Sequence, residues 1–366
     1  MILYILGLDI GGANTKAALI RCDNSKIINS YSHIEYFPFW EKSSNQIIDM
    51  FKRIVGEIII QNGLKLKNVT YIALTITAEL SDAFQTKKEG INLILDSLNN
   101  VFDKEKMYFI STNNEYLDFD KAKSSYMSIS AANWVSTSLF LGNFIKRCIL
   151  IDAGSTTIDI IPIVNSKPAA LGKTDVERLI NHELIYTGGL RATIPSITHF
   201  VPYKDKELRI SFEKFALVSD VHRILNNISE EEYINDTADN RAKSIDNCYS
   251  RLARIICMDI DTISKNDLLR IANFIYEKQL HIISTEILKF MELLLSRSPE
   301  FKEDPLFIIT GLAGDFLIKK ALKGIGFSNF QDYELITNIE DKISSSAIAV
   351  AGAFYYKLNK NMKNAN

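Results

Sequence analysis

An aspartate followed by two glycines and three polar residues stands near the start of the sequence. Apolar residues 1–8 lead into Asp9, and a second apolar stretch, 17–20, follows the polar run. The pattern predicts a β-hairpin whose glycines adopt positive φ and let an anion approach the backbone amides. The residues of this tip are Gly11, Gly12, Asn14, Thr15 and Lys16. Because Mg²⁺ usually takes one or two protein carboxylates, Asp9 is a candidate metal ligand and the tip a candidate phosphate site.

The same plan returns 143 residues later. Asp152 and Gly154 match the aspartate and first glycine of the first hairpin, and Asp159 falls where that hairpin has its lysine. The hydroxylic residues of the second tip are Ser155, Thr156 and Thr157. Self-similarity at a fixed offset indicates a duplicated fold. We therefore expect two α/β lobes with one phosphate-bearing ligand clamped between them, and Asp152 as a second metal ligand.

A third glycine turn follows the apolar residues 306–310. Gly311 and Gly314 bound this turn, and an amphipathic helix is expected over 315–323. A strand, a glycine turn and a helix in this order present free backbone amides at the start of the helix. The two glycines are therefore candidate phosphate contacts, and an ordinary strand-to-helix connection is the alternative.

Glu79 follows an apolar strand predicted over 71–76. Thr75, Thr77 and Glu79 stand at every second position there, so their side chains would point to the same side of an extended chain. A carboxylate at the end of a strand can serve as a general base. It can equally be an exposed turn residue that caps the next segment. Both interpretations stay open at this point.

Two further groups of charged residues are candidates for ligand binding. Arg191 follows a pair of glycines, and a guanidinium there can bind a diphosphate through two hydrogen bonds or form a structural ion pair. Asp236, Asp239 and Lys243 have the i, i+3, i+7 spacing that places side chains on one face of a helix. The lysine would contact an anion and the carboxylates an amine, and a surface salt-bridge face is the alternative.

Composition sets the limits for these candidates. The chain has 366 residues, enough for two domains, and 42 Lys and Arg against 44 Asp and Glu leave a formal net charge of -2. That balance argues against nucleic acid as a general partner, because nucleic-acid binding needs a basic field. The four cysteines form no Cys-x-x-Cys pair and the five histidines form no ligand pattern, so we expect neither a disulfide framework nor a zinc site.

One uncharged stretch, 124–145, is long enough to be tested as a membrane span. Its serines and asparagines interrupt the apolar run of about 20 residues that a span requires, so a buried helix is expected instead. Small residues in 344–353 predict a second helix that packs closely against it. We therefore expect a cytoplasmic protein that makes no membrane contact.

Several phrases of the sequence resemble the superfamily of sugar kinases, heat-shock-70 chaperones and actin. Within that superfamily they are most similar to the hydantoinase/oxoprolinase-like proteins of tetrahydromethanopterin-linked one-carbon metabolism. The phrases lie at 9–17, 74–80, 130–134, 152–162, 172–179, 183–191 and 236–244. Together they cover most of the chain, from Asp9 to about Gly352.

The repeat and the resemblance imply a fold of two ribonuclease-H-like lobes of the actin-like ATPase type. The first lobe would take residues 1–143 and the returning helix 343–366. The second would take residues 144–342 and carry a helical insertion at about 211–296, which we expect to wall the substrate side.

The resemblance further implies a transferase of methanofuran biosynthesis. Such an enzyme condenses an (aminomethyl)furanylmethyl diphosphate with γ-glutamyltyramine, forms an aryl ether and releases diphosphate. Glu79 would assist ionisation of the phenol, while Asp9, Asp152 and Mg²⁺ would stabilise the leaving group. The expected partners are thus a small diphosphate ester and a phenolic acceptor.

Two other functions remain compatible with the same residues. The first is an ATP-dependent kinase or a hydantoinase/oxoprolinase-type enzyme, because the hairpins would hold the phosphates of ATP as well as those of a diphosphate ester. The second is a nucleotide-switched binding module, for which the helical insertion would be the only available partner surface. The sequence leaves the oligomeric state open.

Overall fold

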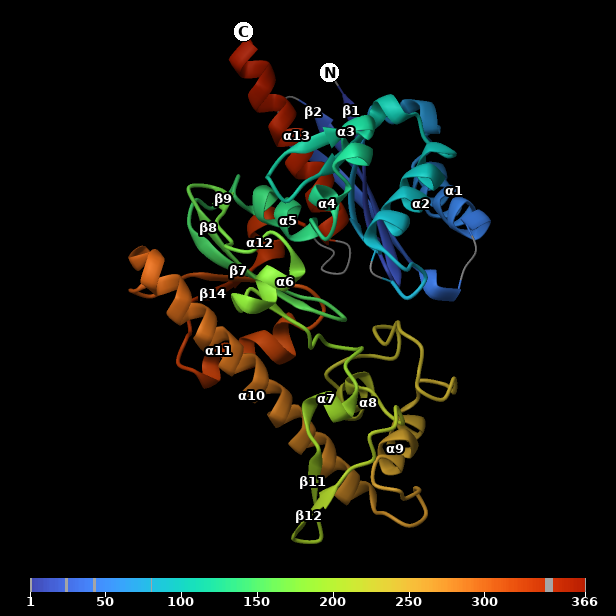
Figure 1. The fold of residues 1–366 in the computed structure, drawn as a ribbon, viewed down its shortest axis with the longest axis vertical. Coiled ribbons are helices and arrows are strands. Elements are labelled where there is room, and N and C mark those ends of the chain that lie inside the picture. Colours follow the sequence, from blue (N-terminus) through green and yellow to red (C-terminus); the bar gives the residue numbers. More distant parts are fainter. Residues whose placement is uncertain (1, 24–25, 42–43, 80, 340–344, 366) are drawn as a thin grey trace. The chain divides into compact units, whose positions relative to one another are not determined.

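The computed structural model describes residues 2–23, 26–41, 44–79, 81–339 and 345–365 (Figure 1). Two compact units divide the chain. Unit 1 comprises Met1–Leu150, Ile161–Ile180 and Gln331–Asn366, and unit 2 comprises Ile151–Ile160 and Asn181–Phe330. The chain therefore passes from one unit to the other four times, and unit 1 is assembled from three separate stretches of sequence.

The first sheet lies entirely in unit 1. Its six strands have the order β3-β2-β1-β4-β5-β6. Their bounds are Leu3–Gly11 (β1), Asn14–Asp23 (β2), Lys26–Tyr36 (β3), Tyr71–Thr77 (β4), Met107–Ile110 (β5) and Tyr116–Asp118 (β6). β1 and β2 form the predicted first hairpin, with Asp9 opposite Lys16. β4 runs parallel to β1 and places Thr75 beside Asp9, so the carboxyl ends of both strands meet at one edge.

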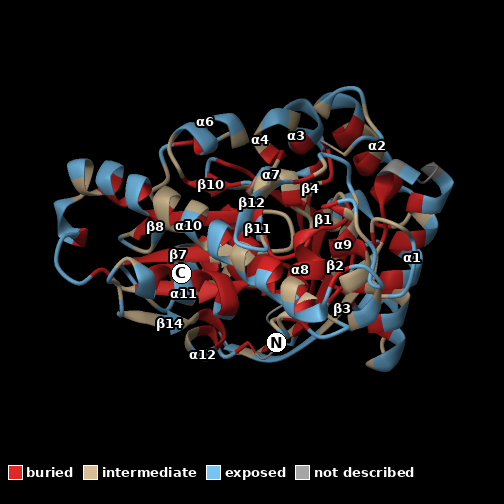
Figure 2. Ribbon diagram, turned by 90° about the horizontal axis from the view of Figure 1, so that it is seen from below, coloured by how far each residue is buried: buried red, intermediate tan, exposed pale blue. Residues whose placement is uncertain are grey.

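The helices of unit 1 include those that pack against this sheet, among them α1, α5 and α13. Their bounds are Ser44–Gln61 (α1), Lys87–Asn99 (α2), Phe119–Ser124 (α3), Tyr126–Ile129 (α4), Asn133–Leu141 (α5), Asp175–Ile180 (α6), Tyr333–Thr337 (α12) and Ser345–Ala365 (α13). Alternate residues of β1, including Leu6 and Leu8, join the core with α1 and α2. Gly7 faces α13, where a Cβ atom would stand 2.0 Å from the carbonyl oxygen of Ala347. Figure 2 shows β1 and β4 as largely buried and the outer faces of α1 and α6 as exposed.

The single helix expected over 124–145 is wrong. The chain forms α4 and α5 instead, separated by Ser130–Ala132, where Ala131 has a φ of 49°. The interruption arises because this segment leaves the helix to bridge β4: the Ala131 amide donates to the Ile76 carbonyl at 3.0 Å. Within the described part of the chain, no helix is long and apolar enough to cross a membrane.

The expected close packing of the small-residue helix is confirmed for its described residues, which begin at Ser345. A Cβ atom at Gly352 of α13 would stand 2.2 Å from Cε2 of Phe140 in α5, so only glycine allows this approach. The predicted first residue of that helix, Ser344, lies outside the described residues.

The second sheet contains the second hairpin. Its strand order is β10-β8-β7-β13-β14, with β9 paired to β8. The bounds are Cys148–Ala153 (β7), Ile158–Val164 (β8), Lys167–Pro168 (β9), Leu184–Ile185 (β10), Phe307–Thr310 (β13) and Phe330–Asp332 (β14). β7 and β8 are neighbours joined by Gly154–Thr157, which confirms the predicted repeat of the hairpin plan.

The helices of unit 2 lie largely in the segment expected to be a helical insertion. They are Ile194–Ile197 (α7), Val218–Ile224 (α8), Ile245–Arg254 (α9), Lys265–Arg297 (α10) and Lys319–Gly324 (α11). A short hairpin of β11 (Phe200–Tyr203) and β12 (Lys206–Arg209) precedes α8. With 33 residues, α10 is the long orange helix in Figure 1, and its buried face packs against α8 and α11.

Candidate functional site

The Asp9 carboxylate is buried at the carboxyl end of β1, with 5% of the residue exposed. Its Oδ2 accepts a hydrogen bond of 2.5 Å from Ser346 Oγ of α13, and Lys16 Nζ lies 3.7 Å away. Its Oδ1 is buried and has no hydrogen-bond partner among the described residues. Because a buried carboxylate oxygen without a partner is costly, this atom fits a hard cation such as Mg²⁺, which prefers oxygen ligands.

Lys16 is held inside the first hairpin. Its Nζ donates to Ser346 Oγ at 3.2 Å in addition to its ion pair with Asp9. Its side chain keeps 27% exposure, so the lysine is not fully enclosed. The lysine thus partly neutralises the buried carboxylate and can still contact an anion.

The positive φ expected at Gly11 and Gly12 is wrong. Among the described residues, the glycines with positive φ are Gly63, Gly311 and Gly326. Glycine is needed at position 11 for space, because a Cβ there would lie 2.7 Å from the Asn14 carbonyl oxygen. A Cβ at position 12 would meet only ordinary contacts, so the second glycine is not required by backbone geometry.

Glu79 is buried, with 1% exposure, so the exposed-turn interpretation is wrong. Ser130 Oγ donates to Glu79 Oε1 at 2.5 Å, and Lys87 Nζ of α2 lies 4.0 Å from the same oxygen. Glu79 Oε2 is buried, and no residue that the structure describes forms a hydrogen bond with it. Burial raises the pKa of Glu79 above its ordinary value, while Ser130 and Lys87 lower it and the charge of Asp175 raises it. A desolvated carboxylate with one unpartnered oxygen is suited to accept a proton.

Sequence reasoning assigned no role to the residues that surround Glu79. Ser130 lies in one of the family-like phrases, and Asp175 in another. A second contact joins these phrases, because the Arg178 guanidinium lies 4.6 Å from the centre of the Trp134 ring. Membership in the family-like phrases was the only sequence signal for these residues. Hydrophobic periodicity could not have shown that the two phrases lie close together in the fold.

The tip of the second hairpin is held by a segment that follows β10. The Gly154 amide donates to the Thr157 carbonyl at 2.9 Å, which closes the turn. The carbonyl oxygens of Gly154, Ser155 and Thr156 accept hydrogen bonds from backbone amides of residues 188–191, at 2.9 to 3.1 Å. A Cβ at Gly188 would lie 2.6 Å from the Gly154 oxygen, so glycine permits this contact.

These contacts set the direction in which the tip amides point. In a planar trans peptide the carbonyl and the following N–H point in opposite directions. Since the three tip carbonyls face residues 188–191, the N–H groups of Ser155, Thr156 and Thr157 point away from that segment. Three successive amides with a common direction can bind an anion. Arg191, predicted to bind diphosphate, uses its amide to hold Ser155, and its side chain is half-buried.

The third glycine turn lies against the end of β7. Gly311 has a φ of +88°, and a Cβ there would stand 2.4 Å from the Ala153 oxygen and 2.8 Å from Asp152 Oδ1. The Ala313 amide donates to the Ala153 carbonyl at 3.0 Å. The structure therefore brings the predicted turn beside the predicted metal ligand Asp152. The helix after Gly314 begins as a π-helical turn over Gly314–Ile318 before it continues as α11.

The helical face expected for Asp236, Asp239 and Lys243 is wrong, because residues 233–243 form turns and irregular structure. Asp239 Oδ1 accepts from the amide of Arg241, and such local side-chain bonds compete with a helix. Asp239 also binds two arginines of α9, Arg251 at 3.1 Å and Arg254 at 2.8 Å. This network occupies its carboxylate, and Lys243 Nζ lies 5.5 Å from the centre of the Tyr233 ring.

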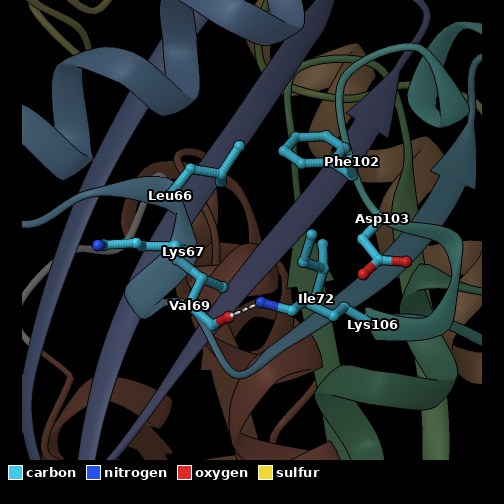
Figure 3. A pocket seen from close by; sticks show the side chains of 7 residues that line it. All are labelled: Leu66, Lys67, Val69, Ile72, Phe102, Asp103 and Lys106. Carbon is cyan, nitrogen blue, oxygen red and sulfur yellow. Dashed lines mark hydrogen bonds between the residues drawn. The ribbon is translucent and has the colours of Figure 1, made fainter.

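A small pocket lies at the opposite edge of the first sheet (Figure 3). It is lined by residues around the amino ends of β4 and β5, including Val69, Phe102 and Lys106, and its volume is about 240 Å³. Lys106 Nζ donates to the Val69 carbonyl at 2.9 Å and so is already used. Ligands of parallel sheets bind outside the carboxyl ends of the strands, and the candidate residues lie there instead.

Thiols and clustered ligands add no second centre to the described residues. The four cysteines are free thiols, and burial raises the pKa of Cys22, Cys148 and Cys248 to about 12. No group of three or more His, Cys, Asp or Glu residues is placed to hold a metal ion in the part of the chain that the structure describes.

Comparison with known proteins supplies relatives. A family model for hydantoinase/oxoprolinase matches residues 70–335. A Methanocaldococcus jannaschii protein is 39% identical over 288 residues, which are 78% of this chain and 82% of the relative. A Methanococcus vannielii protein is 36% identical over 187 residues, 51% of this chain and 80% of the relative. Both are named (4-{4-[2-(gamma-L-glutamylamino)ethyl]phenoxymethyl}furan-2-yl)methanamine synthase.

A solved structure resembles the fold. Nucleotide-free acetone carboxylase has a TM-score of 0.57 at 11% identity, and the match covers 96% of this chain and 70% of that one. At this identity the likeness concerns the fold alone. It confirms the predicted class, an actin-like α/β fold with two sheets.

Proposed function

The chain belongs to the hydantoinase/oxoprolinase family, and from this we propose that it makes the aryl ether for which its two relatives are named. The observation that carries the proposal is 39% identity over 82% of a relative with that synthase name. The named product contains a γ-glutamylaminoethyl phenol, an ether oxygen and an aminomethylfuran. The ether bond divides it into γ-glutamyltyramine and a furanylmethyl group.

In the proposed reaction the phenolic oxygen attacks the furan methylene carbon of a diphosphate ester. The new carbon–oxygen bond forms as the bond from that carbon to the diphosphate breaks, and diphosphate leaves with the electron pair. The phenolic proton passes to a base, which is needed because the pKa of a phenol is about 10. Atoms and charge balance without an oxidant or a nucleotide.

Glu79 is the proposed base. Its Oε2 is buried and has no partner in the described part of the chain, while Ser130 donates a hydrogen bond to Oε1. Because burial raises its pKa, the carboxylate accepts a proton more readily than an exposed glutamate. Ser130 and Lys87 oppose this effect, because each lowers the pKa of Glu79.

The two hairpins are the proposed diphosphate contacts. Lys16 and the amides of Ser155, Thr156 and Thr157 would balance negative charge that develops on the leaving group. Asp9 Oδ1 fits Mg²⁺, with Asp152 proposed as the corresponding ligand in the second copy. A bound Mg²⁺ would supply further charge stabilisation to the diphosphate. We also expect a cytoplasmic enzyme that binds small molecules rather than nucleic acid or membranes.

The test is a reaction of purified protein with the furanylmethyl diphosphate, γ-glutamyltyramine and Mg²⁺. Mass spectrometry should detect the ether, and a diphosphate assay should detect one diphosphate per ether. Glu79→Gln should lower the rate about 100-fold or more, the size of a general-base contribution. Turnover of ATP with an acceptor, without ether formation, would overturn the proposal in favour of the kinase. Both relatives have the synthase name, so the kinase is not favoured.

A further inference from the structure

We propose that Gln279 of α10 is a positioning residue that orients the anion-binding tip Ser155–Thr157 through the segment Thr187–Arg191. This role rests on the proposed function, in which the tip binds diphosphate. Gln279 touches neither hairpin directly. It acts on the segment whose amides hold the tip.

Gln279 is 1% exposed and bonds to three partners. Its Nε2 donates to Thr187 Oγ1 and to the Gly188 carbonyl, each at 3.0 Å, and its Oε1 lies 3.0 Å from His222 Nε2. A primary amide has two N–H donors, and both are used on the segment. A long helix is therefore tied to this segment by a side chain with no remaining donor.

His222 fixes which way the Gln279 amide faces. Asn227 Nδ2 lies 3.2 Å from His222 Nδ1, and since an amide nitrogen only donates, Nδ1 must be the acceptor. The proton of the neutral ring then sits on Nε2 and points at Gln279 Oε1. Burial lowers the pKa of His222 to about 3, so the ring stays neutral and this arrangement persists at physiological pH.

The segment Thr187–Arg191 in turn holds the tip through backbone hydrogen bonds. The Gly188 amide donates to the Thr156 carbonyl and the Gly189 amide to the Gly154 carbonyl, both at 2.9 Å. Gly188 therefore connects Gln279 to the tip, because its carbonyl accepts from Gln279 and its amide donates to the Thr156 carbonyl. If Gly188 rotates, the tip carbonyls lose partners and the amides of Ser155 and Thr156 lose their common direction.

The test compares Gln279→Met with the unaltered protein. Methionine has a similar length and no donor, so Gly188 and Thr187 lose their bonds. Calorimetric titration with inorganic diphosphate and Mg²⁺ should give a dissociation constant about tenfold higher, as expected for loss of roughly 1.4 kcal/mol. The KM for the diphosphate ester should rise with it, while the KM for γ-glutamyltyramine should stay unchanged.

Two further variants separate positioning from general destabilisation. Ile287→Val lies in the same helix and removes one buried methylene, and it should lower the melting temperature without changing diphosphate affinity. Thr187→Val removes one of the two bonds, and it should weaken binding less than Gln279→Met does. If Gln279→Met proves unfolded, Thr187→Val decides the question.

The outcomes distinguish this role from the proposed function. If the unaltered protein binds no diphosphate, the phosphate site fails and the role of Gln279 fails with it. If the unaltered protein binds diphosphate and the folded variants bind it equally well, only the positioning role is overturned.

Discussion

At the residue scale, Glu79 combines opposing influences on one carboxylate. Burial raises its pKa, and Ser130 and Lys87 lower it from two different elements. The sequence pointed to Glu79 as a base but left an exposed turn equally open, because one strand pattern does not reveal what covers its end. Ser130 and Lys87 could not have been paired with it, since they lie 51 and 8 residues away and reach it only through tertiary packing.

Ser130→Ala should move the acidic limb of the rate profile to higher pH. The variant loses the hydrogen bond that favours ionised Glu79, so its pKa rises further and more of the base is protonated at a given pH. The dependence of kcat/KM on pH should show a severalfold loss in acid and a smaller one on the alkaline plateau. Ser128→Ala is the matched control, because the Ser128 hydroxyl donates to the nearby Ser125 carbonyl. An unmoved limb would show that Ser130 does not tune the base.

Glu79→Gln should make the protein more stable at neutral pH while removing activity. Because the folded pKa lies above the ordinary value of 4.5, the folded state retains a proton that the unfolded state loses. Stability therefore falls as the pH rises from 4.5 through the folded pKa, and glutamine removes this loss. Urea unfolding should give a higher midpoint for the variant at neutral pH, with the difference shrinking below pH 4.5. Equal midpoints at neutral pH would contradict the cost assigned to the buried charge.

At the element scale, sequence patterns identified strands and turns better than the irregular segments. Both Asp-x-Gly hairpins and the glycine turn at 311–314 form as expected, although the positive φ expected at Gly11 and Gly12 is absent. The helix expected around Asp239 does not form, since its side chain bonds the Arg241 amide and the arginines of α9. The prediction of a single helix over 124–145 was wrong for a related reason. At Ser130 the chain forms a β-bridge to Ile76 of β4, and this tertiary contact outweighs helix propensity.

Gly311→Ala should lower the free energy of unfolding and the affinity for diphosphate more than its matched control Gly326→Ala does. Both glycines have φ near +88°, so each alanine bears similar backbone strain, about 1–2 kcal/mol. A Cβ at Gly326 meets nothing within 4 Å, whereas at Gly311 it would meet Ala153 and Asp152. Urea unfolding and diphosphate titration of both variants measure the difference. Equal stability and affinity in the two variants would mean that the Gly311 turn does not support Asp152.

At the whole-molecule scale, the near-neutral charge fits recognition by a few placed groups. The net charge of -2 gives no basic field that would draw anions from a distance. The repeat of the hairpin predicted the two sheets of the fold. The sequence could not predict that α10 would bond the segment that holds the second hairpin, because Gln279 and Gly188 are 91 residues apart.

The rate of capture of the diphosphate ester should therefore depend weakly on salt. Steered association falls steeply with ionic strength, and a net charge of -2 gives this chain no overall attraction for anions that salt could screen. Measuring kcat/KM for the ester at low and physiological KCl, with Mg²⁺ in excess, should give similar values. A steep fall, with the KM for γ-glutamyltyramine unchanged, would indicate a local basic funnel instead.

The close packing of α13 against β1 has a consequence for folding during synthesis on the ribosome. The strand that carries Gly7 and Asp9 is made first, but the helix that covers this face begins only at Ser345. All residues of unit 2 have been synthesised once the chain reaches Phe330. Unit 2 can therefore fold before unit 1 is complete. The earliest strands would then remain partly uncovered until almost the whole chain has emerged. Proteolysis of ribosome-bound chains that end after Phe330 should cut β1 and β2 while sparing α10.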